Sequence, residues 1–186
     1  MSWEQLSSRT VYRNRWIEVT EDRVVRPDGE RGIYGVVQVR QPAVFVVAID
    51  DADQVVLVRM TRYTTGPSLE VPAGACDDQP PLVAARRELR EETGLQAGEW
   101  TAIGRMNALN GICRAPEHVY LATGLTQVGD LGGRVEEGIH EVVSVPWSQA
   151  LELVAGGAIT DGESVAALMY ADLHRRGIRP GLPGES

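Results

Sequence analysis

The sequence predicts an α/β protein whose N-terminal region consists of strands alone. Three observations predict this class. Residues 10–39 contain short apolar stretches separated by the turn sequence Arg-Pro-Asp-Gly at 26–29, which is typical of a β-meander. The run 43–49 is almost entirely apolar, as in a central strand buried on both faces. Two later segments, near 79–93 and 161–176, have the apolar spacing of helices.

Length and composition limit the kinds of protein this can be. The 186 residues, 43% of them hydrophobic, suffice for one well-buried domain with a small appended sheet. A formal charge of −8 argues against nonspecific binding to nucleic acid or to anionic membranes, because both need a basic surface. Cys76 and Cys113 are too few for a disulfide framework and wrongly spaced for a zinc site. No apolar run is long enough to cross a bilayer, so we expect a soluble cytoplasmic protein.

The helix predicted after Gly74 has clear end signals. Asp78 can cap its N-terminus, and Pro80 and Pro81 suit a first turn, where backbone N–H groups have no helical acceptor. Gly94 can end the helix in a left-handed conformation. The sequence therefore predicts a short helix with well-marked ends.

Three carboxylates share one strip of this helix. A rotation of about 100° per residue puts Glu88, Glu91 and Glu92 beside an apolar face, while Arg86 and Arg90 point away. Like charges at these spacings repel by roughly 0.2–0.5 kcal/mol per exposed pair. Hard divalent cations such as Mg²⁺ take oxygen ligands of this kind and often bridge to substrate phosphates. The alternative is a solvated acidic face that neighbouring arginines balance.

The order of residues around this helix resembles the Nudix box. Residues 87–95, Arg-Glu-Leu-Arg-Glu-Glu-Thr-Gly-Leu, match the second half of that box completely. Residues 69–74, Leu-Glu-Val-Pro-Ala-Gly, resemble the strand and turn that lead into it, and the N-terminal meander is similar to the extra sheet of the ADP-ribose pyrophosphatase branch. The resemblance covers roughly residues 10–175. It implies a Nudix-type α/β/α sandwich with a mixed sheet and an N-terminal antiparallel β-extension.

The resemblance also implies a division of the chain. Residues 1–40 would form the β-extension, which contributes to dimerisation and substrate binding, and residues 41–176 would form the Nudix hydrolase domain. A small isolated sheet is marginally stable, so covering it in a homodimer makes physical sense. Residues 177–186 are rich in Gly and Pro, and we expect a disordered tail there.

Metal ligands follow from the same resemblance. Glu88, Glu91, Glu92 and the carbonyl oxygen of Ala73 are expected to hold Mg²⁺ or Mn²⁺. Arg87 is expected to orient one of these carboxylates through a bidentate ion pair.

Substrate contacts are expected at two further positions, and a proton acceptor at a third. Arg62 matches the arginine that related pyrophosphatases supply to substrate, and Trp16 is a candidate to stack on the base. Surface solvation and simple packing are their respective alternatives. In the glycine-rich segment 124–138, which we expect to be a mobile loop, Glu137 matches a glutamate that activates water or binds a further metal. Glu136 is the second candidate, and a solvated acidic loop is the alternative.

Two positions depart from the family pattern. Gln79 stands where the box has its first glutamate, and the loop that follows Gly74 is one residue short. Asn110 stands where ADP-ribose pyrophosphatases usually have proline. We expect the first departure to change efficiency or loop geometry without removing the chemistry, and the second to weaken the substrate assignment.

The function that the resemblance implies is metal-dependent hydrolysis of a nucleoside diphosphate linked to another moiety. ADP-ribose, giving AMP and ribose 5-phosphate, or a related nucleotide sugar is the leading substrate class. One alternative is a Nudix hydrolase of another diphosphate, such as a dinucleoside polyphosphate, a GDP-sugar or a coenzyme. Another is a catalytically weak nucleotide sensor, against which the retention of Glu88, Glu91 and Glu92 argues.

Overall fold

The computed structural model describes residues 2–129 and 138–178. The chain divides into two compact units, each described here by itself. The first unit is Met1–Pro42 with Asn107–Glu117, and the second is Ala43–Met106 with His118–Ser186.

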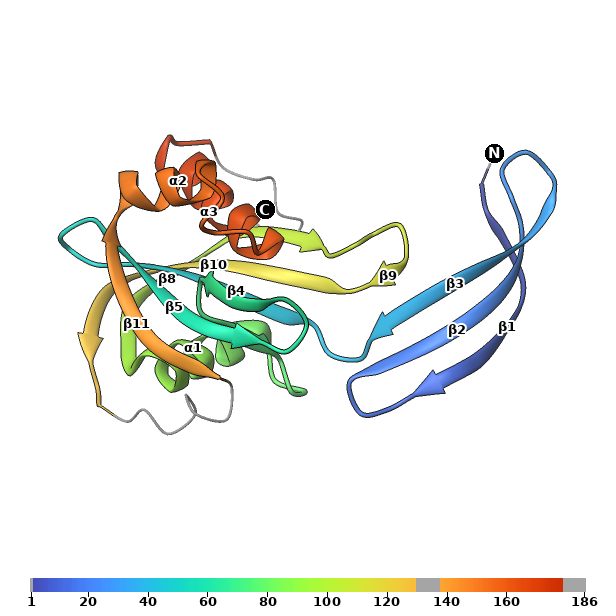
Figure 1. Ribbon diagram of the computed structural model, residues 1–186, viewed down its shortest axis with the longest axis horizontal. Coiled ribbons are helices and arrows are strands. Elements are labelled where there is room, and N and C mark those ends of the chain that lie inside the picture. Colours follow the sequence, from blue (N-terminus) through green and yellow to red (C-terminus); the bar gives the residue numbers. More distant parts are fainter. Residues whose placement is uncertain (1, 130–137, 179–186) are drawn as a thin grey trace. The chain divides into compact units, whose positions relative to one another are not determined.

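The first unit is a four-stranded sheet in the order β1-β2-β3-β9 (Figure 1). Its strands are β1 (Glu4–Arg13), β2 (Ile17–Val25), β3 (Arg31–Val39) and β9 (Cys113–Arg114). The first three form an antiparallel meander, and β9 pairs in parallel with β3. All ten residues of β1 are exposed, so no buried face imposes an apolar alternation on its first half. The sequence pattern therefore did not reveal that this strand begins at Glu4.

The second unit contains a seven-stranded sheet in the order β11-β5-β4-β10-β8, with β6 paired to β5 and β7 paired to β4. The strands are β4 (Ala43–Ile49), β5 (Gln54–Arg62), β6 (Gly66–Glu70), β7 (Ala73–Ala75), β8 (Leu95–Asn107), β10 (Pro116–Gln127) and β11 (Ile139–Pro146). The predicted central strand at 43–49 is confirmed, with every residue after Ala43 buried. The predicted loop at 124–138 is wrong in its first part, because β10 continues through Gln127.

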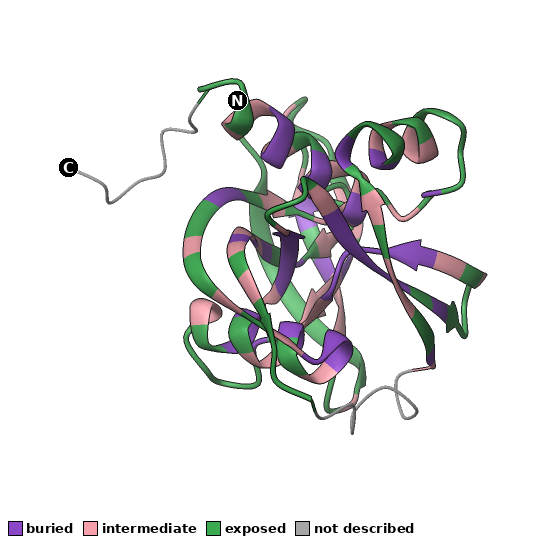
Figure 2. Ribbon diagram, turned by 90° about the vertical axis from the view of Figure 1, so that its left-hand side faces the viewer, coloured by how far each residue is buried: buried purple, intermediate pink, exposed green. Residues whose placement is uncertain are grey.

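Helices cover both faces of this second sheet. They are α1 (Pro81–Thr93), α2 (Trp147–Ala155) and α3 (Gly162–Arg175), with α1 on one side and α2 and α3 on the other (Figure 1). Side chains alternate along β4, so Val46 packs in a cluster with Leu89 of α1, whereas Val47 packs in a cluster with Leu168 of α3. Figure 2 shows buried residues on the strands and along the flanking helices. The predicted α/β/α sandwich is confirmed.

The two ends of α1 differ in how well they were predicted. Gly94 ends the helix in the left-handed region, with φ 72°, as predicted. The N-cap residue is Pro80 and no side-chain hydrogen bond caps the helix, so the predicted cap by Asp78 is wrong. Asp77 and Asp78 both have positive φ, 48° and 62°. The chain therefore turns sharply there, just before Gln79 and the N-cap residue Pro80.

Two predicted features lie outside the described residues. Glu136 and Glu137 fall within residues 130–137, and most of the predicted tail falls within 179–186. In the described ranges, every helix is too short or too polar to span a membrane.

Candidate active site

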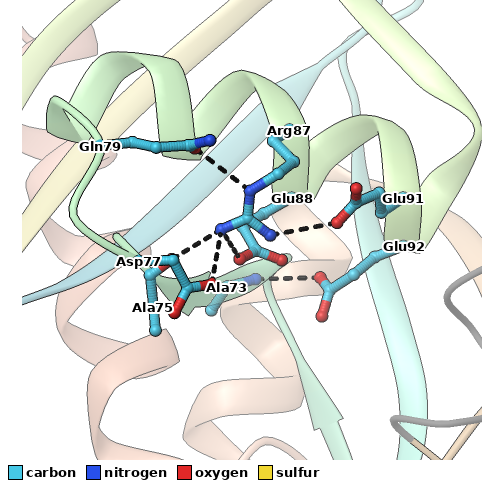
Figure 3. Close-up of polar contacts among 8 residues, drawn as sticks. All are labelled: Ala73, Ala75, Asp77, Gln79, Arg87, Glu88, Glu91 and Glu92. Atoms are coloured by element: carbon cyan, nitrogen blue, oxygen red, sulfur yellow. Dashed lines mark hydrogen bonds and ion pairs between the residues drawn. The ribbon is translucent and has the colours of Figure 1, made fainter. Parts of the chain in front are cut away.

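Two of the box carboxylates are buried where α1 packs on the turn at β7. The Glu88 and Glu92 residues are only 3% and 2% exposed. Glu92 Oε2 accepts a hydrogen bond from the backbone N–H of Ala73 at 2.9 Å (Figure 3). A Cβ on Gly74 would overlap the carboxyl group of Glu88, so glycine permits this close approach. The turn and the helix thus bring Ala73 together with two of the three predicted carboxylates.

Arg87 connects the buried carboxylate of Glu88 with the half-exposed one of Glu91. Its Nη2 lies 2.8 Å from Glu88 Oε1, and its Nη1 donates to Glu91 Oε2 at 3.1 Å (Figure 3). We expected both donors on one carboxylate, but the structure shows one nitrogen on each of two. Partial burial lowers the pKa of Arg87, but attraction to Glu88, Glu91 and Asp77 outweighs it and leaves the pKa above its usual value. The guanidinium therefore remains charged between these acids.

The shortened loop also contacts Arg87. The Nε of Arg87 donates to Gln79 Oε1 at 3.3 Å. The Nη2 of Arg87 donates to the Ala75 carbonyl at 2.8 Å and to Asp77 Oδ2 at 3.3 Å. Gln79, in place of the first box glutamate, thus reaches the arginine through its amide oxygen. Sequence reasoning missed Ala75 and Asp77, because the left-handed turn that directs them to Arg87 has no periodic signal.

The oxygen atoms at this site are suitable ligands for a hard divalent cation. Buried glutamate oxygens next to a backbone turn are the ligands that Mg²⁺ and Mn²⁺ prefer. Among the described residues, however, no three His, Cys, Asp or Glu side chains gather closely enough to hold a metal ion. Glu88 and Glu91 are directed at Arg87, and Glu92 is directed at the Ala73 amide. We therefore expect cation binding to compete with Arg87 for these carboxylates.

Arg62 is held by a buried acid that sequence reasoning missed. Its Nε and Nη2 donate to the two carboxylate oxygens of Glu70 at 3.1 and 2.6 Å. The Glu70 hydrogen bond raises the pKa of Arg62 above its usual value despite burial, and the charges of Glu92 and Asp161 add to this. The charges of Arg62 and of Glu92 on the box helix therefore interact. Nothing in the local pattern around Glu70 indicated a buried ion pair.

The N-terminus of α3 lies beside the same region. Ser164 Oγ accepts a hydrogen bond from the Val71 N–H at 3.0 Å. Burial, and then the charges of Asp161 and Glu70, raise the pKa of Glu163 above its usual value. Because the pKa of Glu163 is higher in the folded state than in the unfolded state, the folded protein binds the carboxyl proton more tightly. The resulting stabilisation is present at a pH below the unfolded-state pKa. It is lost as the pH rises through the folded-state pKa, so the free energy of unfolding falls over that range.

Trp16 belongs to the first unit and precedes β2. Its side chain is largely exposed, and the guanidinium of Arg15 lies 4.3 Å from the ring centroid. This cation–π contact leaves an exposed aromatic surface. The stacking role of Trp16 stays a prediction, as do the roles of Glu136 and Glu137, which lie outside the described residues.

Comparisons with known proteins give a consistent result. A family model described as the NUDIX domain matches residues 39–168, and one described as the nucleoside diphosphate sugar hydrolase N-terminal domain matches residues 3–37. A Mycobacterium tuberculosis protein named ADP-ribose pyrophosphatase is 34% identical over 170 residues, which span 90% of this chain and 82% of that protein. An Escherichia coli protein named GDP-mannose pyrophosphatase is 35% identical over 127 residues, or 64% of this chain and 66% of that protein.

A solved structure supports the fold. The crystal structure of an ADP compounds hydrolase superposes with a TM-score of 0.82 at 23% identity, covering 96% of this chain and 97% of that chain. At that identity the likeness shows the fold alone. Since the NUDIX match spans well over half of the sequence and the 34% identical relative is covered over most of its length, this chain belongs to the NUDIX domain family.

Proposed function

We propose that this chain is a Nudix pyrophosphohydrolase that hydrolyses ADP-ribose or a related nucleotide sugar. The observation that carries this proposal is the packing of Ala73 and Gly74 on the buried carboxylates of Glu88 and Glu92. Such a site offers oxygen ligands to a cation that can bridge to a diphosphate. The relatives named ADP-ribose pyrophosphatase and GDP-mannose pyrophosphatase support the substrate class.

Glu88, Glu91, Glu92 and the Ala73 carbonyl would hold the metal, for which we propose Mg²⁺ or Mn²⁺. A bound ion of this kind neutralises diphosphate charge and lowers the pKa of a water molecule. Arg87 keeps Glu88 and Glu91 oriented through its two ion pairs.

Three further side chains act on the substrate in this proposal. Arg62 donates to a phosphate oxygen, and Trp16 stacks on the base. Glu137 accepts the proton of the attacking water, with Glu136 as the alternative. The products from ADP-ribose are AMP and ribose 5-phosphate.

A substrate panel tests this function. We expect the purified chain to convert ADP-ribose to AMP and ribose 5-phosphate in Mg²⁺ or Mn²⁺, to lose this activity in EDTA, and to regain it in excess metal. GDP-mannose and a dinucleoside polyphosphate complete the panel, with chromatography of the nucleotide products as the measurement. Stabilisation against heat by ADP-ribose and Mg²⁺, with no product from any substrate after long incubation, would instead indicate a nucleotide sensor.

A GDP-sugar is the second candidate substrate. The 35% identity to a protein named GDP-mannose pyrophosphatase favours it, and Asn110 weakens the assignment to ADP-ribose. In the same panel, faster release of GMP than of AMP would make it the better assignment.

We also propose that the N-terminal extension, residues 1–40, forms a homodimer contact. Every residue of β1 is exposed, and the sheet leaves large apolar side chains exposed at Leu6, Val11 and Ile33. Exposed apolar groups of this kind on a small sheet are stabilised by association. Light scattering should give about twice the chain mass of 20.2 kDa, and a monomer mass at working concentrations would contradict the dimer.

The cytoplasm is the compartment we propose, because Cys76 and Cys113 are both free.

A further inference from the structure

We propose that Glu70 is a positioning residue that holds the guanidinium of Arg62 in one orientation for binding the substrate diphosphate. This inference rests on the proposed function. It assigns a role to a buried acid outside the predicted set of site residues.

The register of the β5–β6 hairpin shows how far Arg62 reaches. Arg62 pairs with Gly66 near the turn, whereas Glu70 pairs with Val58 at the other end of β6. The two pairs are separated by four residues along β5, which is about 13 Å of strand. Arg62 must therefore fold back along the hairpin to reach Glu70. That contact brings the guanidinium toward the end of β6, from which the chain continues to Ala73.

Burial makes this contact stronger than a surface ion pair. Glu70 is 3% exposed, and both of its carboxylate oxygens accept from Arg62, at 3.1 and 2.6 Å. An unpaired buried carboxylate is costly, so the acid holds its arginine tightly. The two hydrogen bonds to Glu70 use Nε and Nη2 of Arg62. The N–H groups of Nη1 lie on a different edge of the planar guanidinium. The Arg62 side chain remains 45% exposed, and in this proposal these Nη1 donors bind a phosphate.

Competing acids make the orientation dependent on Glu70. The pKa of Arg62 is raised first by Glu70 and to a smaller extent by Glu92 and Asp161, so these carboxylates also attract the guanidinium. Without the charge of Glu70, only these weaker attractions would remain to orient the guanidinium. Glu70 thus sets the orientation of the arginine.

The alternative is that the pair only stabilises the hairpin, and the chain offers a matched control. Arg59, on the same strand, donates to Glu141 of β11 at 3.1 Å, and both side chains are more than half exposed. This second cross-strand pair has the same chemistry but no buried acid. Glu141→Gln should therefore leave substrate binding unchanged.

The test compares Glu70→Gln, Arg62→Lys, the double variant and Glu141→Gln with the wild type. Steady-state kinetics with ADP-ribose and Mg²⁺ give kcat and KM, calorimetry gives the Kd of an ADP-ribose analogue with a methylene-bridged diphosphate, and thermal unfolding gives Tm. We expect Glu70→Gln and Arg62→Lys each to raise KM and Kd about tenfold, with kcat within about threefold of wild type. The double variant should match Arg62→Lys, because each substitution breaks the same two-bond fork between Arg62 and Glu70.

Several results would overturn the proposal. A lower Tm for Glu70→Gln with wild-type KM and Kd would show a purely structural ion pair. If Glu70→Gln fails to fold, Arg62→Lys is the deciding variant. It keeps a cation opposite the buried acid and loses only the planar fork. Wild-type KM and Kd for Arg62→Lys would then reject the inference. A wild-type protein that turns over no nucleoside diphosphate derivative would reject the proposed function and this inference together.

Discussion

Replacing Glu92 with Gln should lower kcat for ADP-ribose by at least about a hundredfold, or roughly 2.7 kcal/mol of activation free energy. Glu92 is almost fully buried, and its Oε2 accepts the Ala73 N–H at 2.9 Å. The amide oxygen of glutamine can accept that same bond in the same space, so the packing should persist while the charge that would bind the cation is lost. Steady-state kinetics across a Mg²⁺ titration measure the effect.

The control for this variant is Glu152→Gln, on the exposed side of α2. It makes the same chemical change away from the box and should retain wild-type turnover. Circular dichroism checks that both variants fold. If Glu92→Gln kept more than a tenth of wild-type kcat at saturating metal, Glu92 would not be a metal ligand.

Gly74→Ala should lower both stability and turnover by displacing Glu88. The added methyl group would overlap the Glu88 carboxyl group, which is buried and paired with Arg87 at 2.8 Å. Because the overlapping atoms are the end of a side chain, the fold can persist with Glu88 moved, at an overpacking cost of about 1–3 kcal/mol. We expect the free energy of unfolding to fall by that amount and kcat to fall at least about tenfold. Urea denaturation and kinetics measure the two effects.

Two other glycines separate the steric effect from the site. A Cβ on Gly104 would lie 2.6 Å from the ring of Tyr170 on α3, which covers the opposite face of the sheet from α1, so Gly104→Ala should lower stability without changing the metal dependence of turnover. Gly162 has open space around its Cβ position, and Gly162→Ala should be neutral in stability. Wild-type stability and kcat for Gly74→Ala would mean that the turn and Glu88 are not in close contact.

Local patterns predicted the elements that have a clear buried face. The uninterrupted apolar run Ala43–Ile49 is β4, and Gly94 ends α1 as its position indicated. The pattern failed where burial does not impose a period. The first half of β1 is fully exposed, and Gly124 to Gln127 looks like a loop because of its glycine but continues β10. The wrong cap at Asp78 has a similar cause, since a left-handed turn depends on backbone conformation that composition alone does not reveal.

The candidate site was predicted in its residue types but not in its contacts. Glu88, Glu91 and Glu92 were recognised from their helical spacing and from their match to the box. That spacing could not show that Glu88 and Glu92 are buried while Glu91 is half exposed, or that Arg87 joins two carboxylates and the loop. Glu70 was recognised only as part of the strand that leads into the box, because its partner Arg62 is brought to it by the hairpin.

The sequence by itself determined the α/β class, the helix with its strip of carboxylates and the NUDIX family, because these depend on residue types and on spacings of a few residues. Only the tertiary structure decided which acids are buried, which arginine or backbone amide each one contacts and why a side chain at position 74 would overlap Glu88. Those properties arise where β7 packs on α1 and where β5 pairs with β6. Ala73 and Glu92 are 19 residues apart in the chain, and no local pattern shows that a backbone amide and a carboxylate so far apart share one hydrogen bond.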